Sequence, residues 1–204
     1  MLNTGIYASQ YDSKMQVISP AFQETDPANF GESFYSYTKS RVEDVLKFYP
    51  NILVLRLRMP VSDDLHPRNF VTKITRYPKV VNVPNSNSIL HDLLPVAVAM
   101  AEHSETGVVN FTNPGAISHN EVLQLYKEII DPAYTWENFS LEEQAKVIKA
   151  GRSNCELDAS KLMDLVKQYR SEGHEFEVPE IHEAYRRCFE RMKAGMYSKE
   201  GAPV

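Results

Sequence analysis

A helix that leads directly into a buried strand is the feature that most restricts the fold of this chain. Residues 33–49 carry apolar side chains at helical spacing, and Pro50 ends that helix. Residues 52–57, ILVLRL, follow at once as an apolar, β-branched run that is typical of a buried strand. Because a helix joined directly to a buried strand is half of a βαβ unit, we predict an α/β fold with a parallel sheet.

The rest of the chain continues this alternation. The same patterns predict short strands at 79–83 and 107–111, and helices at 69–77, 91–103 and 118–130. Residues 156–195 are predicted to be helical, with interruptions at Gly173 and Pro179. Ser118 and Glu121 have the spacing of a capping box at the start of a helix, and Ser140 and Glu143 repeat it. We expect residues 60–68 to form a polar loop.

Composition excludes several classes of protein. The 204 residues are 43% hydrophobic and carry a net charge of −5, which favours a folded core and argues against nucleic acid as a partner. No apolar run is long enough to span a membrane, and the first residues do not resemble a signal peptide. Two cysteines are too few for a disulfide framework or a structural zinc site. We therefore expect a soluble, cytoplasmic protein without a metal.

One pair of side chains in the first helix suggests chemistry. Tyr35 and Lys39 are four residues apart, so both point to the same side of the helix. A neighbouring ammonium stabilises a phenolate and lowers the pKa of a tyrosine, as proton transfer near neutral pH requires. Spacing alone equally permits an exposed lysine beside a half-buried tyrosine. Thr4, at the end of a predicted strand, would complete a trio able to polarise and protonate a carbonyl during hydride transfer.

Long stretches around this pair resemble a known family. GESFYSYTKSRVEDVL is similar to the active-site helix of extended short-chain dehydrogenases. The runs LRLRMPVSDDLHPRNFVTKITRYPKVVNVPNS and VVNFTNPGAISHNEVLQLYKEIIDPAYTWENFSLEEQAKVIKAGRSNCELDASKL resemble nucleotide-rhamnose synthases, over about residues 29–163. The resemblance implies an NADPH-dependent enzyme that epimerises a UDP- or dTDP-linked 4-keto-6-deoxy-glucose at C3 and C5 and then reduces C4.

The resemblance also implies roles for individual residues. Tyr35 and Lys39 match the reductase pair, which also contacts the cofactor, and Thr4 matches the hydroxyl residue. Lys73 matches a lysine used in epimerisation, where a cationic acid or base exchanges protons next to the carbonyl. Without the resemblance, Lys73 is as readily an exposed helix lysine.

The resemblance implies a substrate-binding side as well. Arg152 matches the region that contacts the sugar nucleotide, and a guanidinium suits a diphosphate, although a structural or capping arginine is a comparable interpretation. Arg68 and Asn69 match a loop near the sugar. His66 in that loop is more commonly a plain exposed histidine, and Trp136 is more readily a core residue than a platform for the base.

Two departures from the family pattern qualify this interpretation. Ile6 stands where the family has a cysteine that acts as the second epimerase acid or base, and an isoleucine cannot transfer a proton. No Gly-x-Gly-x-x-Gly occurs in the sequence, although this fingerprint opens a dinucleotide-binding sheet. We therefore expect a partial Rossmann-like parallel sheet that lacks its first βαβαβ half, on the order of 100 residues.

The expected organisation is a catalytic part at residues 1–164, with a helical substrate-binding region, and a helical extension at 165–204. The alternative function is a sugar-nucleotide-binding fragment or pseudoenzyme without activity. Such a fragment would pair with a full-length relative, and a dimer is also compatible with the sequence.

Overall fold

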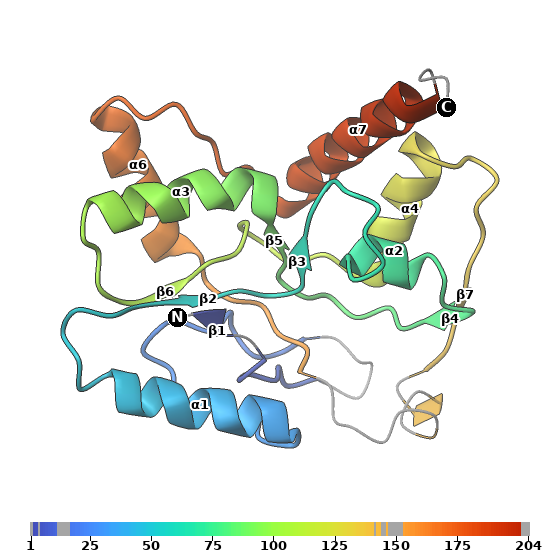
Figure 1. Ribbon diagram of the computed structural model, residues 1–204. Helices are drawn as coiled ribbons and strands as arrows, with labels where there is room; N and C mark the ends of the chain where they lie inside the picture. The colour runs from blue at the N-terminus through green and yellow to red at the C-terminus, as the bar shows by residue number, and fades with distance from the viewer. Residues whose placement is uncertain are drawn as a thin grey trace.

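The computed structural model describes residues 2–3, 5–11, 17–140, 142–143, 146 and 153–200, and the side chains of 2–3 and 197–200 are not considered. Its central sheet has three parallel strands in the order β1-β2-β6 (Figure 1): β1 (Leu2–Asn3), β2 (Leu53–Arg56) and β6 (Gly107–Asn110). Leu55 of β2 aligns with Leu2 on one side and with Val109 on the other. This arrangement confirms the predicted α/β fold with a parallel sheet.

Helices cover both faces of this sheet. Figure 1 shows α1 (Phe34–Leu46) below β1 and β2, with α3 (Leu90–Glu102) and α6 (Ser160–Ser171) on the opposite side. The space between the sheet and α3 and α6 is filled by apolar side chains, which include Leu55, Val109, Leu93, Met100, Leu162 and Tyr169. Burial of this size supplies most of the stability of a layered α/β unit.

A second apolar core lies beyond the carboxyl ends of the strands, at the right of Figure 1. It is enclosed by α2 (Phe70–Ile74), α4 (His119–Ile129) and α7 (Ile181–Glu200), together with two short parallel pairs. These pairs are β3 (Pro60–Val61) with β5 (Ser88–Ile89), and β4 (Lys79–Val80) with β7 (Glu137–Asn138). Ile181, Tyr185 and Phe189 of α7 are fully buried in this core.

Local sequence signals largely agree with these elements. The capping box of Ser118 and Glu121 is present, and the Ser140 and Glu143 pair makes both of its hydrogen bonds. The predicted loop 60–68 begins with the paired strand β3, which its polar composition conceals. The predicted helical region 156–195 is interrupted around Gly173 and Pro179 as expected, and it consists of the separate helices α6 and α7. No helix in the part of the chain described above is both long and apolar enough to cross a membrane.

Candidate active site

Tyr35 and Lys39 lie together at the amino-terminal end of α1. The Ser33 hydroxyl caps the helix by accepting a hydrogen bond from the Ser36 amide at 3.1 Å, which places Tyr35 in the first turn. The Lys39 Nζ lies 5.7 Å from the centre of the Tyr35 ring. Tyr35 is 55% exposed, so its hydroxyl is accessible to a bound molecule. The helical spacing therefore brings the predicted acid and its cationic neighbour to one accessible site.

The end of β1 approaches this helix closely. Gly5 has a φ of +73°, and a β-carbon at Gly5 would lie 3.3 Å from the Ser36 hydroxyl. A side chain at residue 5 would be strained by this φ as well as crowded by α1. Thr4 itself lies outside the described residues. Its neighbour Gly5 lies beside Ser36, the residue that follows Tyr35.

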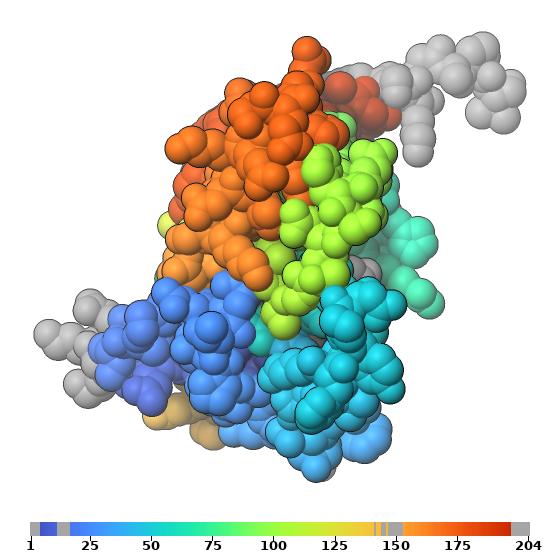
Figure 2. Space-filling model, turned by 90° about the vertical axis from the view of Figure 1, so that its left-hand side faces the viewer, coloured from blue at the N-terminus to red at the C-terminus, as the bar shows by residue number. Residues whose placement is uncertain are grey.

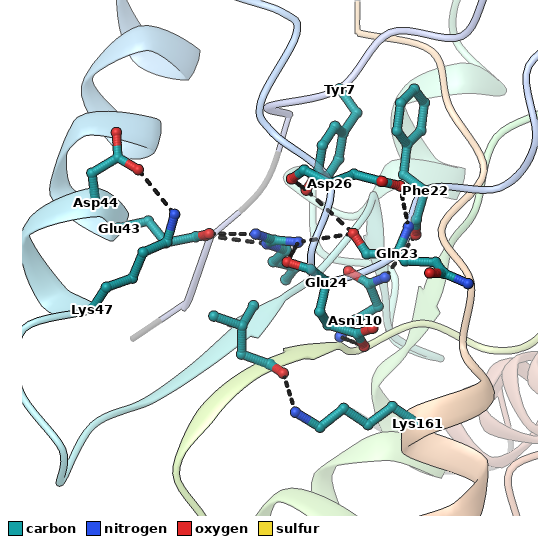
Figure 3. A network of polar contacts seen from close by, with 12 residues as sticks. Tyr7, Phe22, Gln23, Glu24, Asp26, Glu43, Asp44, Lys47, Asn110 and Lys161 are labelled. Atoms are coloured by element: carbon teal, nitrogen blue, oxygen red, sulfur yellow. Dashed lines mark hydrogen bonds and ion pairs between the residues drawn. The ribbon is translucent and has the colours of Figure 1, made fainter.

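A buried ion pair holds α1 against the sheet (Figure 3). The Arg56 side chain of β2 donates to both carboxylate oxygens of Glu43 in α1, with 3.2 Å between Nε and Oε2. The same guanidinium lies 5.3 Å from the ring centre of Tyr7 and donates to the Glu24 carbonyl. Tyr7 in turn stacks on Phe22. This cluster fixes both the helix that carries Tyr35 and Lys39 and the loop that follows β1.

A second buried arginine, Arg58, connects three segments beside Gly5. Its Nη1 donates to the Ser153 hydroxyl at 3.0 Å, and its Nη2 donates to Asn85 Oδ1 at 2.7 Å. Asn85 Oδ1 also accepts from the Cys155 amide. The segment 153–155 is thereby held next to Gly5. The sequence signal that could have identified Arg58 is the alternation of arginine with apolar residues in LRLRM, which puts two charges into a buried segment.

The thiol of Cys155 occupies the same small cluster as Ile6. Both side chains are buried, and they pack with Tyr7 and Leu157. Burial raises the pKa of the Cys155 thiol, and the nearby Arg58 charge partly opposes that increase. The cysteine that the family places at position 6 is absent here, but a different thiol lies beside that position. No sequence signal connects residues 6 and 155, because only the fold makes them neighbours.

Three further predicted residues lie at α2. Arg68 and Asn69 directly precede the helix, and Lys73 is part of it. Lys73 and Arg68 are exposed. Asn69 is buried and caps α2, and its Nδ2 donates to the carbonyls of Ser62 and Asp64. The side chain of Asn69 therefore fixes the shape of the loop before α2.

Three further predicted residues have different outcomes. Arg152 lies outside the described residues, although its neighbour Ser153 is held by Arg58. Trp136 packs against the second core and donates to Asn120, in agreement with its interpretation as a core residue. His66 is exposed and accepts a hydrogen bond from the Arg68 amide through Nδ1. The described residues contain no group of three or more His, Cys, Asp or Glu side chains that could hold a metal ion.

Comparison with known proteins places this arrangement in context. The chain is 58% identical over 155 residues to the bifunctional dTDP-4-dehydrorhamnose 3,5-epimerase/dTDP-4-dehydrorhamnose reductase of Arabidopsis thaliana. It is 56% identical over 155 residues to the Arabidopsis trifunctional enzyme RHM1, a UDP-glucose 4,6-dehydratase, UDP-4-keto-6-deoxy-D-glucose 3,5-epimerase and UDP-4-keto-L-rhamnose reductase. This chain is a homologue of the nucleotide-rhamnose synthases. The matched regions cover 75% of this chain, 52% of the bifunctional relative and 23% of RHM1.

Solved structures agree with this relationship. The crystal structure of the L780 UDP-rhamnose synthase from Acanthamoeba polyphaga mimivirus matches with a TM-score of 0.82 at 38% identity. The match covers 93% of this chain and 63% of that synthase. A dTDP-4-dehydrorhamnose reductase from Bacillus anthracis, solved in complex with NADP, has a TM-score of 0.65 at 16% identity, which supports the Rossmann-like fold alone. No family profile matches the chain.

Proposed function

We propose that this chain carries the active-site helix and the substrate-binding part of a nucleotide-rhamnose synthase. The reaction would convert UDP- or dTDP-linked 4-keto-6-deoxy-glucose to the corresponding nucleotide-linked L-rhamnose. It would epimerise C3 and C5 and reduce C4. The accessible Tyr35 and Lys39 pair on α1, within long stretches shared with epimerase/reductases, is the observation that carries this proposal. The two unpaired buried cysteines fit the expected cytoplasmic location.

In the reduction step, Tyr35 would give a proton to the C4 oxygen. The Lys39 ammonium, on the same side of α1, would favour the phenolate that remains and restore the proton. Thr4 would hydrogen-bond the same oxygen and fix the carbonyl. This division of work needs the end of β1 to lie beside the first turn of α1, as Gly5 and Ser36 do.

In the epimerisation step, Lys73 would exchange protons at the carbons next to the carbonyl, or stabilise the enolate that forms. Lys73 is exposed on α2. For this role, the bound sugar would have to lie against the face of α2 that carries Lys73. Two carbons must invert their configuration, and Ile6 cannot serve the second one. Arg68, Asn69 and Arg152 would form the substrate side, with Asn69 acting through the shape of its loop.

The described residues fit one end of an NADPH molecule. The Tyr35 hydroxyl and the Lys39 ammonium are a donor set suited to the nicotinamide ribose. The bound cofactor would supply the hydride, whereas the chain's residues would orient the sugar and supply the proton. The pyrophosphate of a dinucleotide is commonly bound at a helix N-terminus by a Gly-x-Gly-x-x-Gly turn. The sequence contains no such motif.

The alternative is a sugar-nucleotide-binding protein without activity that pairs with a full-length relative. The presence of Ile6 in place of a thiol favours it, as does the missing glycine fingerprint. Both hypotheses predict binding of the sugar nucleotide, and they differ in proton exchange and reduction.

Titration calorimetry with UDP, dTDP and NADPH is the first test. The proposal expects a nucleoside diphosphate to bind, and Arg68→Ala to weaken that binding while Tyr35→Phe leaves it unchanged. Tyr35→Phe is the matched control because it removes only a hydroxyl. Absence of binding by both UDP and dTDP would overturn the proposal and its alternative together.

Exchange of substrate hydrogens in D2O separates the two hypotheses without a cofactor. The active enzyme should place deuterium next to the C4 carbonyl, and Lys73→Met should abolish that exchange. If Ile6 blocks the second inversion, deuterium enters at one carbon only, and Ile6→Cys extends it to the other. A bound substrate with no exchange in any variant would instead establish the inactive alternative. Consumption of NADPH, lost in Tyr35→Phe, then reports the reduction step.

A further inference from the structure

The loop between β3 and α2 is held from outside by the helix α7. Residues 64–68 of this loop are exposed. Asp63, just before them, accepts a hydrogen bond from the Arg191 side chain of α7, with 2.8 Å between Nε and Oδ2. The sulfur of Cys188, about one turn earlier in α7, lies 3.8 Å from the Ser62 carbonyl oxygen. Two adjacent residues at the start of the loop are therefore both contacted by α7.

A second anchor acts within the loop itself. The Asn69 amide Nδ2 donates to the carbonyl oxygens of Ser62 and Asp64, on either side of Asp63. Asn69 thus closes the loop on itself, and the contacts from α7 connect the closed loop to the second core. The position of Arg68, in the exposed part of the loop, therefore depends on both anchors.

The ion pair matters more to the loop than to α7. Ile181, Tyr185 and Phe189 of α7 are fully buried in the second core, so apolar packing already fixes this helix. The side chains of Arg191 and Asp63 are 28% and 34% exposed, and an ion pair with this exposure contributes little to the stability of the whole fold. A loop with few buried side chains opens easily, so one contact of this kind changes how often it opens.

Two basic side chains lie near Asp63, and Arg191 is the stronger partner. His91 Nδ1 of α3 is 3.8 Å from the same Asp63 oxygen, which is too long for a hydrogen bond. The His91 side chain is also 59% exposed, so solvent and salt screen its interaction with the carboxylate. The contact from α7 is therefore the one that fixes Asp63.

We propose that Arg191 is a positioning residue for substrate binding, which holds the loop 62–69 so that Arg68 meets the sugar nucleotide. Arg191 would not touch the substrate and would act through Asp63. This inference rests on the proposed function, because that function assigns the substrate side to Arg68 and Asn69. It adds the α7 helix, which lies far along the chain, to the elements that determine substrate affinity.

The lysine assigned to epimerisation should not depend on this contact. Lys73 is part of α2, and Val71 and Ile74 pack this helix into the second core with 1% exposure each. Loss of Arg191 would therefore free the loop before α2 without moving α2 itself. The expected signature is a higher KM for the sugar nucleotide with little change in kcat.

Titration calorimetry with UDP and dTDP gives the first test. Arg191→Met should weaken binding about fivefold, and Arg191→Lys should restore part of the affinity because it keeps the charge. Arg187→Met is the matched control, since it removes the same charge from the same helix but its ion pairs are with Glu177 and Glu183. Equal weakening by Arg191→Met and Arg187→Met would overturn the proposal.

Combined variants show whether Arg191 acts through the loop. In Arg68→Ala, the further change Arg191→Met should cost little more affinity, because the side chain to be positioned is gone. Asp63→Ala should weaken binding as Arg191→Met does, and the two together should be no worse than either. Deuterium exchange at saturating UDP-4-keto-6-deoxy-glucose should stay within about twofold of the wild-type rate. Losses that multiply in these pairs, or a collapse of the saturated rate, would show a general structural role and overturn the proposal.

Amide hydrogen exchange without any ligand separates this inference from the proposed function. Arg191→Met should accelerate exchange across 62–69 and leave 181–189 unchanged. If the wild type binds neither UDP nor dTDP, the proposed function fails and the substrate role of the anchor fails with it, even where exchange across 62–69 is faster. Nucleotide binding by the wild type together with unchanged exchange across 62–69 would overturn this inference alone.

Discussion

Glu43 of α1 and Arg56 of β2 form an ion pair that is almost completely removed from solvent, with side chains 3% and 4% exposed. This pair links the helix that carries Tyr35 and Lys39 to the central strand of the sheet. By contrast, α3 and α6 pack against the opposite face of the sheet through apolar side chains. This electrostatic contact therefore contributes to the position of the candidate active site.

Breaking that contact should destabilise the fold strongly. Glu43→Gln leaves a buried guanidinium without its counter-charge, and we expect a loss of about 3–5 kcal/mol in the free energy of unfolding. The double variant Glu43→Leu/Arg56→Met should recover much of that loss. Urea denaturation measures both effects. Glu137→Gln, which breaks the exposed ion pair with Lys79, is the control and should change stability by less than about 1 kcal/mol. Equal costs for Glu43→Gln and Glu137→Gln would contradict the prediction.

Removal of the Asn85 amide should release the segment after residue 152. Asn85 Oδ1 accepts from both Arg58 and the Cys155 amide, so Asn85→Ala removes the acceptor of the buried Cys155 amide and leaves Arg58 Nη2 with only the Ser153 carbonyl. We expect a loss of about 1–3 kcal/mol and faster amide exchange across 153–157. Hydrogen exchange with mass spectrometry measures the local effect. Asn138→Ala removes an exposed amide and should leave exchange in 153–157 unchanged. An effect confined to residues near 85 would argue against this connection.

The junction of α3 and α6 should respond to pH. At the surface shown in Figure 2, these helices lie side by side, and His103 contacts Glu172 at 2.7 Å. The hydrogen bond to the Ala99 carbonyl, followed by that to Glu172, raises the pKa of His103 above its ordinary value. A raised folded-state pKa stabilises the fold below the unfolded pKa, and this contribution disappears as pH rises through the folded value.

The pH response is measured by comparing the wild type with His103→Gln. The wild type should exceed the variant in stability by more at a pH of about 5.5 than at about 9. Glu172→Gln should reduce this pH dependence, because it removes one of the groups that raise the pKa of His103. A stability difference that is the same at both pH values would refute the assignment.

The capping box of α4 should have a moderate, measurable effect. The Ser118 hydroxyl accepts from the Glu121 amide, and the Glu121 carboxylate accepts from the Ser118 amide at 2.8 Å. Ser118→Ala should cost about 1 kcal/mol in thermal or urea unfolding. Ser171→Ala removes an exposed hydroxyl at the end of α6 and should have almost no effect. A cost for Ser118→Ala no larger than that of Ser171→Ala would show that the cap is energetically silent.

Sequence patterns predicted the parts of the molecule that depend on local rules. The helix before ILVLRL, the turn at Pro50 and the cap at Ser118 follow from spacing, backbone restriction and side-chain bonding within a few residues. The pairing of β3 with β5 was not predictable, because these strands of two residues carry no periodicity and are defined only by their partners.

The amino-acid sequence by itself determined the α/β class, and it placed Tyr35 and Lys39 on one side of one helix because helical geometry is local. Only the tertiary structure decided that Ile6 lies beside Cys155, that Arg58 holds the segment after residue 152, and that Asn69 is occupied by its own loop. These relationships join residues that local periodicity does not connect. They depend on which surfaces are buried together, and burial is a property of the whole fold.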